Sequence, residues 1–337
     1  MSIVYYGNFS ITKMNVLNKT KFHIKRMSER LKPCSFIFSY SLISKNADGN
    51  FAAEISFDSF IAQLKYIKDR YNIISLDTLT EALRSNKLHR NSMALTFDIG
   101  YLETLELVVP FLKSMQIPAA FFIRNEDIAA DTNIPIDDIL REIFLGKISP
   151  KLQEDLENYL KNEGYHWTLN SRVEKIEAFH RILRLIYKLE KSKRIDMIDN
   201  MLKSCPLNLE NKNKYGVAGR EHLREVEKNN LFSMGINFNF FSGLESEDQF
   251  NEILERKRSF EAEINNEIKY CSYFLLDPEN YWIDVAGIFK SMGFKAACFD
   301  MPSLIKNDTN IYQIPRLNPR NVGLQQFKIN LNEFLKY

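Results

Sequence analysis

The chain has 337 residues, roughly two average domain lengths, although a single α/β barrel can use that many. Apolar residues make up 45% and aromatic residues 12%, enough for a packed core, and the 12 Gly and 10 Pro are too few for a collagen-like or low-complexity chain. The 45 basic residues against 43 acidic ones leave a net charge of +2, which gives no argument for a nucleic-acid or membrane-surface partner.

Strand-like and helix-like segments alternate before residue 136. A strand is predicted where an apolar run is bounded by turn residues, and a helix where apolar residues recur every three or four positions. Residues 1–34 are expected to form an N-terminal arm. The elements that follow are a strand at Ser35–Ile43, a helix within 57–71, a strand from Asn72, a helix from Asp77, a strand at Met93–Phe97, a helix at Glu103–Met115 and a strand at Ala119–Ile123.

The middle of the chain has a different character. Residues 136–213 are charged and helix-periodic, with no strand signal, so we expect an inserted helical subdomain there. The alternation then resumes. The predicted elements are a helix at Glu221–Lys228, a strand at Ser233–Phe240, a helix at Glu247–Ile264, a strand at Tyr270–Phe274, a helix at Tyr281–Met292, strands at Ala296–Phe299 and Ile311–Ile314, and a helix at Leu324–Leu335.

About seven strands separated by helices predict an α/β fold, a distorted or incomplete (β/α) barrel of parallel strands. Its two parts are residues 35–135 and 214–337, on either side of the helical insertion. No GxGxxG turn supports dinucleotide binding. Functional residues of such folds follow the carboxyl ends of the strands, which directs attention to Asp98, after the strand MALTF, and to residues 237–242.

Cysteine usage and the N-terminal residues bear on location. The four cysteines lie far apart, with no CxxC pair, so we expect reduced thiols. Residues 1–20 lack the apolar core of a secretory signal, and no stretch of about 20 apolar residues occurs. These features predict a cytoplasmic protein without a membrane span. They do not predict an oligomeric state.

One long stretch, LTFDIGYLETLELVVPFLKSMQIPAAFFI, places an aspartate at the end of one apolar strand and begins a second apolar strand about twenty residues later. FIFSYSLIS precedes it, and EHLREVEKNNLFSMGINFNFFSGL follows the insertion. These three stretches resemble, in order, the TFDDG motif, the first-strand YHR segment and the HxxxH motif of the polysaccharide deacetylases, the NodB-homology or carbohydrate esterase 4 family. The resemblance covers roughly residues 35–125 and 216–320.

The resemblance implies an activity and a site. In that family the first Asp of TFDDG is the general base, and the second Asp and the two histidines hold a divalent metal that activates water and polarises an N-acetyl carbonyl. Asp98 matches the base, but Ile99, Asn237 and Phe241 stand at the three metal-ligand positions. Isoleucine and phenylalanine offer no donor atom, and an asparagine oxygen is a poor substitute for imidazole. A degenerate site without a metal or other cofactor is therefore expected.

Further positions are candidates for contact with a ligand. Tyr40 stands in place of the family's first-strand histidine, and Tyr273 matches the tyrosine of a later strand motif. Arg316 follows the last predicted strand, where a barrel would aim a side chain at an anionic group; an ion-paired or solvated arginine is the alternative. Together with Asn237 and Phe241, these three are the predicted ligand-binding residues.

Three functions are open at this point. The first is a deacetylase-like pseudoenzyme of carbohydrate or cell-surface glycan metabolism that binds a sugar-type small molecule or glycan precursor, or serves as a scaffold. The second is a metal-independent enzyme in which Asp98 is the general base for acyl or formyl transfer, or amide hydrolysis, on an amino sugar. The third is a metal-dependent N-deacetylase with unrecognised ligands. Asp98 also has a purely structural interpretation, as a turn or capping residue.

Overall fold

The computed structural model describes the chain from Ser35 onward, with gaps. The described residues are 35–47, 54–99, 101–124, 136–145, 149–162, 164–187, 189–204, 218, 220–241, 247–275 and 284–336. The predicted N-terminal arm, residues 1–34, lies outside them, as do residues 205–213 at the end of the predicted insertion.

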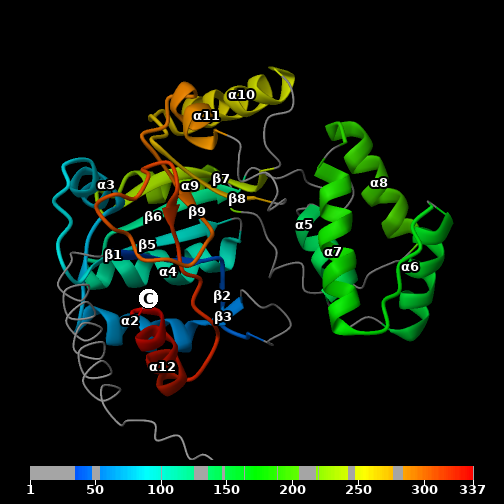
Figure 1. Cartoon of the computed structure of the whole chain (residues 1–337), viewed down its shortest axis with the longest axis horizontal. Coiled ribbons are helices and arrows are strands. Elements are labelled where there is room, and N and C mark those ends of the chain that lie inside the picture. The colour runs from blue at the N-terminus through cyan, green and yellow to red at the C-terminus, as the bar shows by residue number, and fades with distance from the viewer. Residues whose placement is uncertain are drawn as a thin grey trace, which may run out of the picture.

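Parallel strands form one sheet (Figure 1), and from β5 to β10 the order of the strands in the sheet is their order in the chain. The order is β1 (Ser35–Tyr40), β5 (Ser92–Ile99), β6 (Ala119–Arg124), β7 (Phe232–Phe241), β8 (Tyr270–Leu275), β9 (Ala296–Phe299) and β10 (Ile314–Pro315). A short strand, β4 (Asn72–Ile73), also pairs with β5.

The two ends of this sheet come together. After β10, Leu317 forms a parallel bridge with Phe38 of β1. The Ser39 N–H donates to the Leu317 carbonyl at 3.0 Å, and the Leu317 N–H donates to the Ile37 carbonyl at 2.8 Å. The strands therefore form a nearly closed barrel, which confirms the predicted distorted (β/α) barrel.

Helices connect the strands and cover the barrel. They are α2 (Phe57–Lys68), α3 (Leu76–Arg84), α4 (Leu102–Met115), α9 (Arg220–Glu227), α10 (Glu247–Ile264), α11 (Val285–Ser291) and α12 (Leu324–Phe334). Side chains cap the first turns of α2, α3 and α11. At the start of α2 the Ser56 hydroxyl accepts the Ser59 N–H at 3.2 Å, and Asp58 lies in the first turn, where a negative charge favours the helix dipole.

Side chains alternate between two faces along every strand, because successive residues of a strand point in opposite directions. In β1, Phe36, Phe38 and Tyr40 join the core between the barrel and its helices. Ile37 instead joins a second apolar cluster with Ala94 and other alternate strand residues, which α3 completes. We call the face of the strands that carries Ile37 the inner face.

The described part of the predicted insertion consists of helices and the segments that connect them. Residues 136–204 contain α5 (Ile136–Leu145), α6 (Pro150–Asn162), α7 (Arg172–Tyr187) and α8 (Lys191–Ser204), and no strand occurs among those that the structure describes. These helices lie beside the barrel (Figure 1) and share an apolar core of their own. Leu42 of β2 and Tyr101, which directly precedes α4, reach that core, and the Tyr101 hydroxyl donates to Asp138 Oδ1 at 2.7 Å. The division into domains stays a prediction.

Two predicted strands differ from the structure. The run Ser35–Ile43 is not one strand, because β1 ends at Tyr40 and β2 (Leu42–Ser44) pairs with β3 (Glu54–Ser56) in a separate two-stranded sheet. The strand predicted at Ile311–Ile314 begins only at its last residue. Asn310 turns the chain there, since its side-chain oxygen accepts the Tyr312 N–H at 2.9 Å, an arrangement that asparagine favours in turns.

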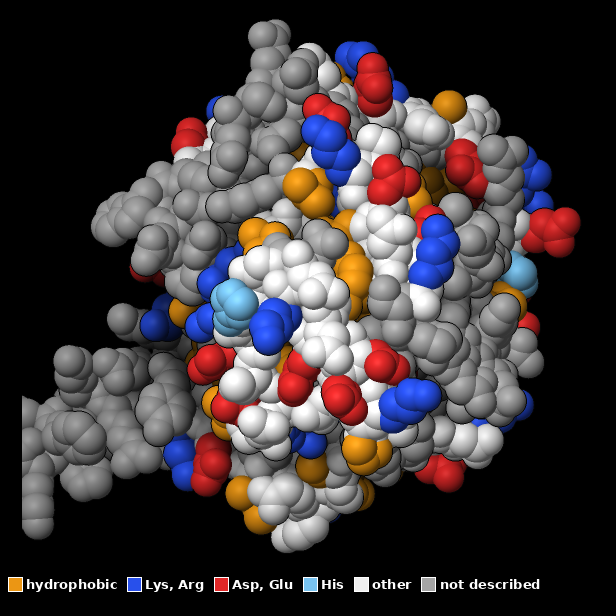
Figure 2. All heavy atoms as spheres, turned by 90° about the vertical axis from the view of Figure 1, so that its right-hand side faces the viewer, with side chains coloured by type: hydrophobic (Ala, Val, Ile, Leu, Met, Phe, Trp, Pro, Cys, Tyr) orange, Lys and Arg blue, Asp and Glu red, His pale blue; other side chains and the backbone are white. Residues whose placement is uncertain are grey.

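Figure 2 views the molecule from the side on which α6, α7 and α8 lie in Figure 1. Basic and acidic side chains are interspersed over the described part of this face, which carries no continuous patch of one sign. Among the described residues, no helix is both long enough and apolar enough to cross a membrane.

Gly235 of β7 leaves room for a buried ring on the inner face. A Cβ at this position would lie 2.5 Å from Phe122 Cδ1 and 2.7 Å from the Tyr270 carbonyl oxygen. Gly235→Ala is therefore expected to lower the free energy of unfolding by about 1–3 kcal/mol, measured by urea denaturation. Gly323→Ala is the control: its Cβ meets no atom within 4 Å, and only the cap of α12 changes, so a loss under about 1 kcal/mol is expected. Equal losses would contradict this packing account.

Candidate functional site

Polar side chains gather on the inner face toward the carboxyl ends of the strands. They come from β1, β5, β7 and β8 and from the residues that directly follow β9 and β10. Hydrogen bonds link all of them into one network. We call this network the Asp98 cluster; its members are Ser39, Thr96, Asp98, Asn237, Ser272, Asp300 and Arg316.

Asp98 is the centre of the network and is only 5% exposed. Arg316 grips its carboxylate with two hydrogen bonds, Nη1 to Oδ1 at 2.8 Å and Nη2 to Oδ2 at 2.9 Å. The Ser272 hydroxyl donates to Oδ1 at 3.2 Å and the Ser39 hydroxyl to Oδ2 at 3.3 Å. A carboxylate has about four acceptor sites, so Asp98 has every site occupied.

Arg316 is equally saturated, and its side chain is fully buried. Besides its bonds to Asp98, its Nη1 donates to Thr96 Oγ1 at 3.4 Å, its Nε donates to Asp300 Oδ1 at 2.8 Å, and its Nη2 pairs with the same oxygen. These five contacts match the five N–H groups of a guanidinium. Its carbon atom Cζ also lies 5.4 Å from the centre of the Phe122 ring, within cation–π range.

The charge of Arg316 follows from these contacts. Burial disfavours a charged guanidinium, but Asp300 and Asp98 together outweigh burial and raise the pKa of Arg316 above its usual value. Arg316 therefore stays cationic and compensates one of the two carboxylates. Contact between Arg316 and an anionic ligand stays a prediction, and in this structure the guanidinium pairs with Asp98 and Asp300.

Asn237 lies at one edge of the cluster and is 3% exposed. Its Nδ2 donates to Ser272 Oγ at 2.8 Å, and that hydroxyl in turn donates to Asp98. The structure thus brings Asp98 and Asn237 together with a single hydroxyl between them. The Asn237 Oδ1 atom is buried and has no hydrogen-bond partner among the described residues. A buried acceptor of this kind is costly unless something donates to it.

Asp300 lies at the other edge and is the more open of the two carboxylates, with 18% of its side chain exposed. The Nε and Nη2 atoms of Arg316 both contact Asp300 Oδ1, whereas Asp300 Oδ2 has no partner among the described residues. Burial raises the pKa of Asp300 from 3.8 to about 6. Burial and the nearby negative charge of Asp98 together outweigh Arg316, which stabilises the ionised carboxylate and lowers the pKa.

This raised pKa predicts a pH dependence of stability. The folded chain holds the Asp300 proton more tightly than the unfolded chain, so the contribution of Asp300 is fully present below about pH 4 and is lost as the pH rises through about 6. Wild type should therefore lose stability relative to Asp300→Asn between pH 4 and 7, by about 1.4 kcal/mol for each unit that separates the two pKa values. Urea denaturation at several pH values measures the difference, and parallel pH curves would contradict the expectation.

Two predicted ligand residues lie on the opposite face of their strands. Tyr40 is fully buried against α2, where its hydroxyl donates to Gln63 Oε1 at 3.3 Å and its ring stacks on Phe97. Burial raises the pKa of Tyr40 well above its usual value. Tyr273 donates to the Tyr312 carbonyl at 3.1 Å. Both belong to the core between barrel and helices, so the structure does not bring them to Asp98.

The cluster members that were not predicted from the sequence are Ser39, Thr96, Ser272 and Asp300. Their signal is the alternation of strand residues: Ser39 precedes Tyr40, and Ser272 precedes Tyr273, so each serine faces inward where its neighbour faces outward. Asp300 follows β9 in the same relation in which Arg316 follows β10. Because the carboxyl ends of parallel strands meet at one end of a barrel, that position predicts proximity.

The divalent metal that the fold family implies does not fit this donor set. Of the three metal-ligand positions, Ile99 and Phe241 carry hydrocarbon side chains, which have no donor atom and whose placement lies outside the described part of the structure. The third, Asn237, uses its amide nitrogen to donate to Ser272. Among the described residues, no three His, Cys, Asp or Glu side chains are grouped so that they could hold a metal ion.

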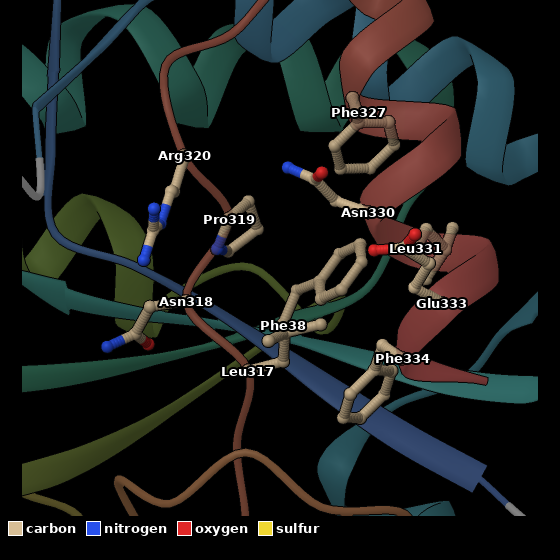
Figure 3. Close-up of a pocket in the computed structure, with 10 residues that line it drawn as sticks. All are labelled: Phe38, Leu317, Asn318, Pro319, Arg320, Phe327, Asn330, Leu331, Glu333 and Phe334. Atoms are coloured by element: carbon tan, nitrogen blue, oxygen red, sulfur yellow. The ribbon is translucent and has the colours of Figure 1, made fainter. Parts of the chain in front are cut away.

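A separate pocket of about 290 Å³ lies outside the barrel, where the segment after β10 passes α12 (Figure 3). Aromatic rings and aliphatic side chains form most of its lining, and amide and charged groups form the rest. The lining residues are Phe38, Leu317, Asn318, Pro319, Arg320, Phe327, Asn330, Leu331, Glu333 and Phe334. None of them belongs to the Asp98 cluster, so this pocket is a second place where a ligand could be tested.

No protein-family model matches this sequence, and no curated protein matches it either. Solved structures do match. The Streptococcus pyogenes deacetylase PplD, in complex with acetate, has 14% identity and a TM-score of 0.50, over 87% of this chain and 97% of that one. IcaB from Ammonifex degensii has 11% identity and a TM-score of 0.51, over 90% of this chain and 98% of that one. At such identities the likeness concerns the fold, and it confirms the resemblance seen in the motifs: the chain has the fold of the polysaccharide deacetylases.

Proposed function

We propose that this chain is a deacetylase-like protein of carbohydrate or cell-surface glycan metabolism that binds a sugar-type ligand at the Asp98 cluster without a metal. The observation that carries the proposal is the double hydrogen bond from Arg316 to Asp98. A guanidinium holds the carboxylate at the end of β5, while the neighbouring metal-ligand positions lack donor atoms. A cytoplasmic location, expected from the sequence, stays a prediction.

The same contacts argue against Asp98 as a general base. A base needs a free lone pair within hydrogen-bond reach of the proton that it removes. All acceptor sites of Asp98 are filled, two by Arg316 and two by the hydroxyls of Ser39 and Ser272. The cluster therefore supports ligand binding better than acyl transfer or amide hydrolysis at Asp98.

The edges of the cluster support a ligand rich in hydrogen-bond donors. Asn237 Oδ1 and Asp300 Oδ2 are both acceptors without a partner among the described residues. A sugar carries several hydroxyl groups that can donate to such atoms, and the structural neighbours include a deacetylase in complex with acetate. We assign Asn237 to ligand contact on this basis, and Phe241, the last residue of β7, stays a predicted contact.

Calorimetric titration with short oligomers of N-acetylglucosamine and of glucosamine, together with an assay for acetate release in added zinc, tests this function. Binding of at least one oligomer without acetate release above background is expected. Asn237→Leu should weaken binding by about tenfold, because it removes the free acceptor. Asn318→Leu, in the pocket beside α12, should leave binding unchanged.

Three results would overturn the proposal. They are zinc-dependent release of acetate, the absence of binding by any oligomer, and loss of binding in Asn318→Leu but not in Asn237→Leu, which would place the ligand in the other pocket. Circular dichroism and thermal melting of both variants separate a local effect from a loss of fold.

A further inference from the structure

The Asp98 cluster has one charged atom left without a partner. Two nitrogen atoms of Arg316 contact Asp300 Oδ1, whereas Asp300 Oδ2 accepts no hydrogen bond from any described residue. Asp300 is also the more exposed of the two carboxylates in the cluster. Asp98, by contrast, is saturated. A ligand that enters the cluster can therefore reach a carboxylate only at Asp300.

The charge balance of the cluster favours a cation at that atom. Its charged members in the described part of the chain are two carboxylates, Asp98 and Asp300, and one guanidinium, Arg316. At neutral pH these groups sum to one negative charge, since the pKa of Asp300 is about 6. The single positive charge of Arg316 is already included in this sum, and the two carboxylates share it. A partly buried excess charge is most stable when an opposite charge pairs with it.

Amino sugars differ at this point from their acetylated forms. The free amine of an amino sugar takes up a proton close to neutral pH, and a neighbouring carboxylate favours that protonated form, which brings a positive charge and three N–H donors. An N-acetyl group brings no charge and one N–H donor, and a plain hydroxyl brings no charge either. Hydrogen bonds that involve an ion pair are roughly twice as strong as neutral ones.

We propose that Asp300 Oδ2 binds the ammonium group of a de-N-acetylated amino sugar, so that the chain recognises the product of deacetylation in preference to its substrate. This inference rests on the proposed sugar-binding function and names the chemical class of the ligand. Asp300 acts as a specificity-determining residue: it selects for the amine, while the hydroxyls of the sugar donate to Asn237 Oδ1.

The test is a comparison of three neutral-pH titrations of the full chain with oligomers of equal length built from glucosamine, N-acetylglucosamine and glucose. The glucosamine oligomer is expected to bind about tenfold more tightly than either of the others. Asp300→Asn keeps an acceptor for Arg316 but removes the charge, and it should abolish this preference while weak binding of the neutral oligomers persists. Asp308→Asn, an exposed aspartate between β9 and β10, should leave the preference intact.

The outcomes distinguish a failure of the amine preference from a failure of the proposed sugar binding. Equal or tighter binding of the acetylated or glucose oligomer by the wild-type chain would overturn the inference and leave sugar binding standing. A preference for the amine that survives in a folded Asp300→Asn variant would also overturn it. Absence of binding by all three oligomers would overturn the proposed function itself. The wild-type comparison needs no variant, so it decides the preference even where Asp300→Asn fails to fold.

Discussion

Replacing Arg316 with leucine is expected to lower the free energy of unfolding by about 3–5 kcal/mol, because the change strands two carboxylates inside the barrel. Asp98 would keep only its two hydroxyl donors, and the Asp300 side chain would lose both contacts that reach it from the guanidinium. Chemical denaturation followed by circular dichroism measures the loss. A loss below about 1 kcal/mol would mean that the ion pairs do not hold the barrel end together.

Two further variants show whether the effect comes from the unpaired charges. Arg320→Leu is the matched control, since Arg320 is exposed and its side chain makes no hydrogen bond or ion pair with any described residue; a change within about 0.5 kcal/mol is expected. Adding Asp98→Asn and Asp300→Asn to Arg316→Leu removes the stranded charges and should recover most of the loss, because a buried charge set can be replaced by neutral groups at little cost. No recovery would indicate lost packing as the cause.

The second large effect is a gain of metal binding. The triple change Ile99→Asp, Asn237→His and Phe241→His supplies a carboxylate and two imidazoles at the positions where the motif resemblance places the metal ligands. These positions lie near the carboxyl ends of β5 and β7, which flank β6 in the sheet. Three protein ligands of this kind are what a zinc site with an open position uses, so about one zinc ion per chain is expected by elemental analysis after dialysis.

Asn237→His alone is the control for the triple variant. One imidazole cannot hold zinc against dialysis, so this single variant should retain far less metal than the triple variant. A triple variant that folds, as judged by circular dichroism, yet retains no more zinc than wild type would contradict the alignment of β5 and β7 with the deacetylase motifs.

The sequence predicted elements well where the apolar period was long and regular. The helix at Glu247–Ile264 and the strand at Ala296–Phe299 have the predicted bounds, because apolar residues recur at helical spacing in the first and form a continuous buried run in the second. The strand predicted at Ile311–Ile314 is wrong over its first three residues, because the Asn310 side chain accepts the Tyr312 N–H and holds the chain in a turn there. Local hydrogen bonds of this kind compete with strand formation and leave little trace in an apolar pattern.

The site was predictable only in part, for two physical reasons. A strand changes face at every residue, so an assignment that is one position off selects the wrong face; Tyr40 and Tyr273 lie against helices, whereas Ser39 and Ser272 bond to Asp98. The contacts of Arg316 depend in addition on closure of the barrel. Asp98 and Arg316 are 218 residues apart in the chain, and no local pattern reports how the two ends of the sheet meet.

The zinc content of the purified wild-type chain shows whether the Asp98 cluster has taken the place of the metal site that the motif resemblance implies. The chain would be incubated with excess zinc, dialysed and analysed for metal, with the triple variant beside it as the positive control. Because Ile99 and Phe241 offer no donor atom, we expect far less than one zinc ion per wild-type chain. About one zinc ion per chain, lost on Asn237→Leu, would contradict this expectation.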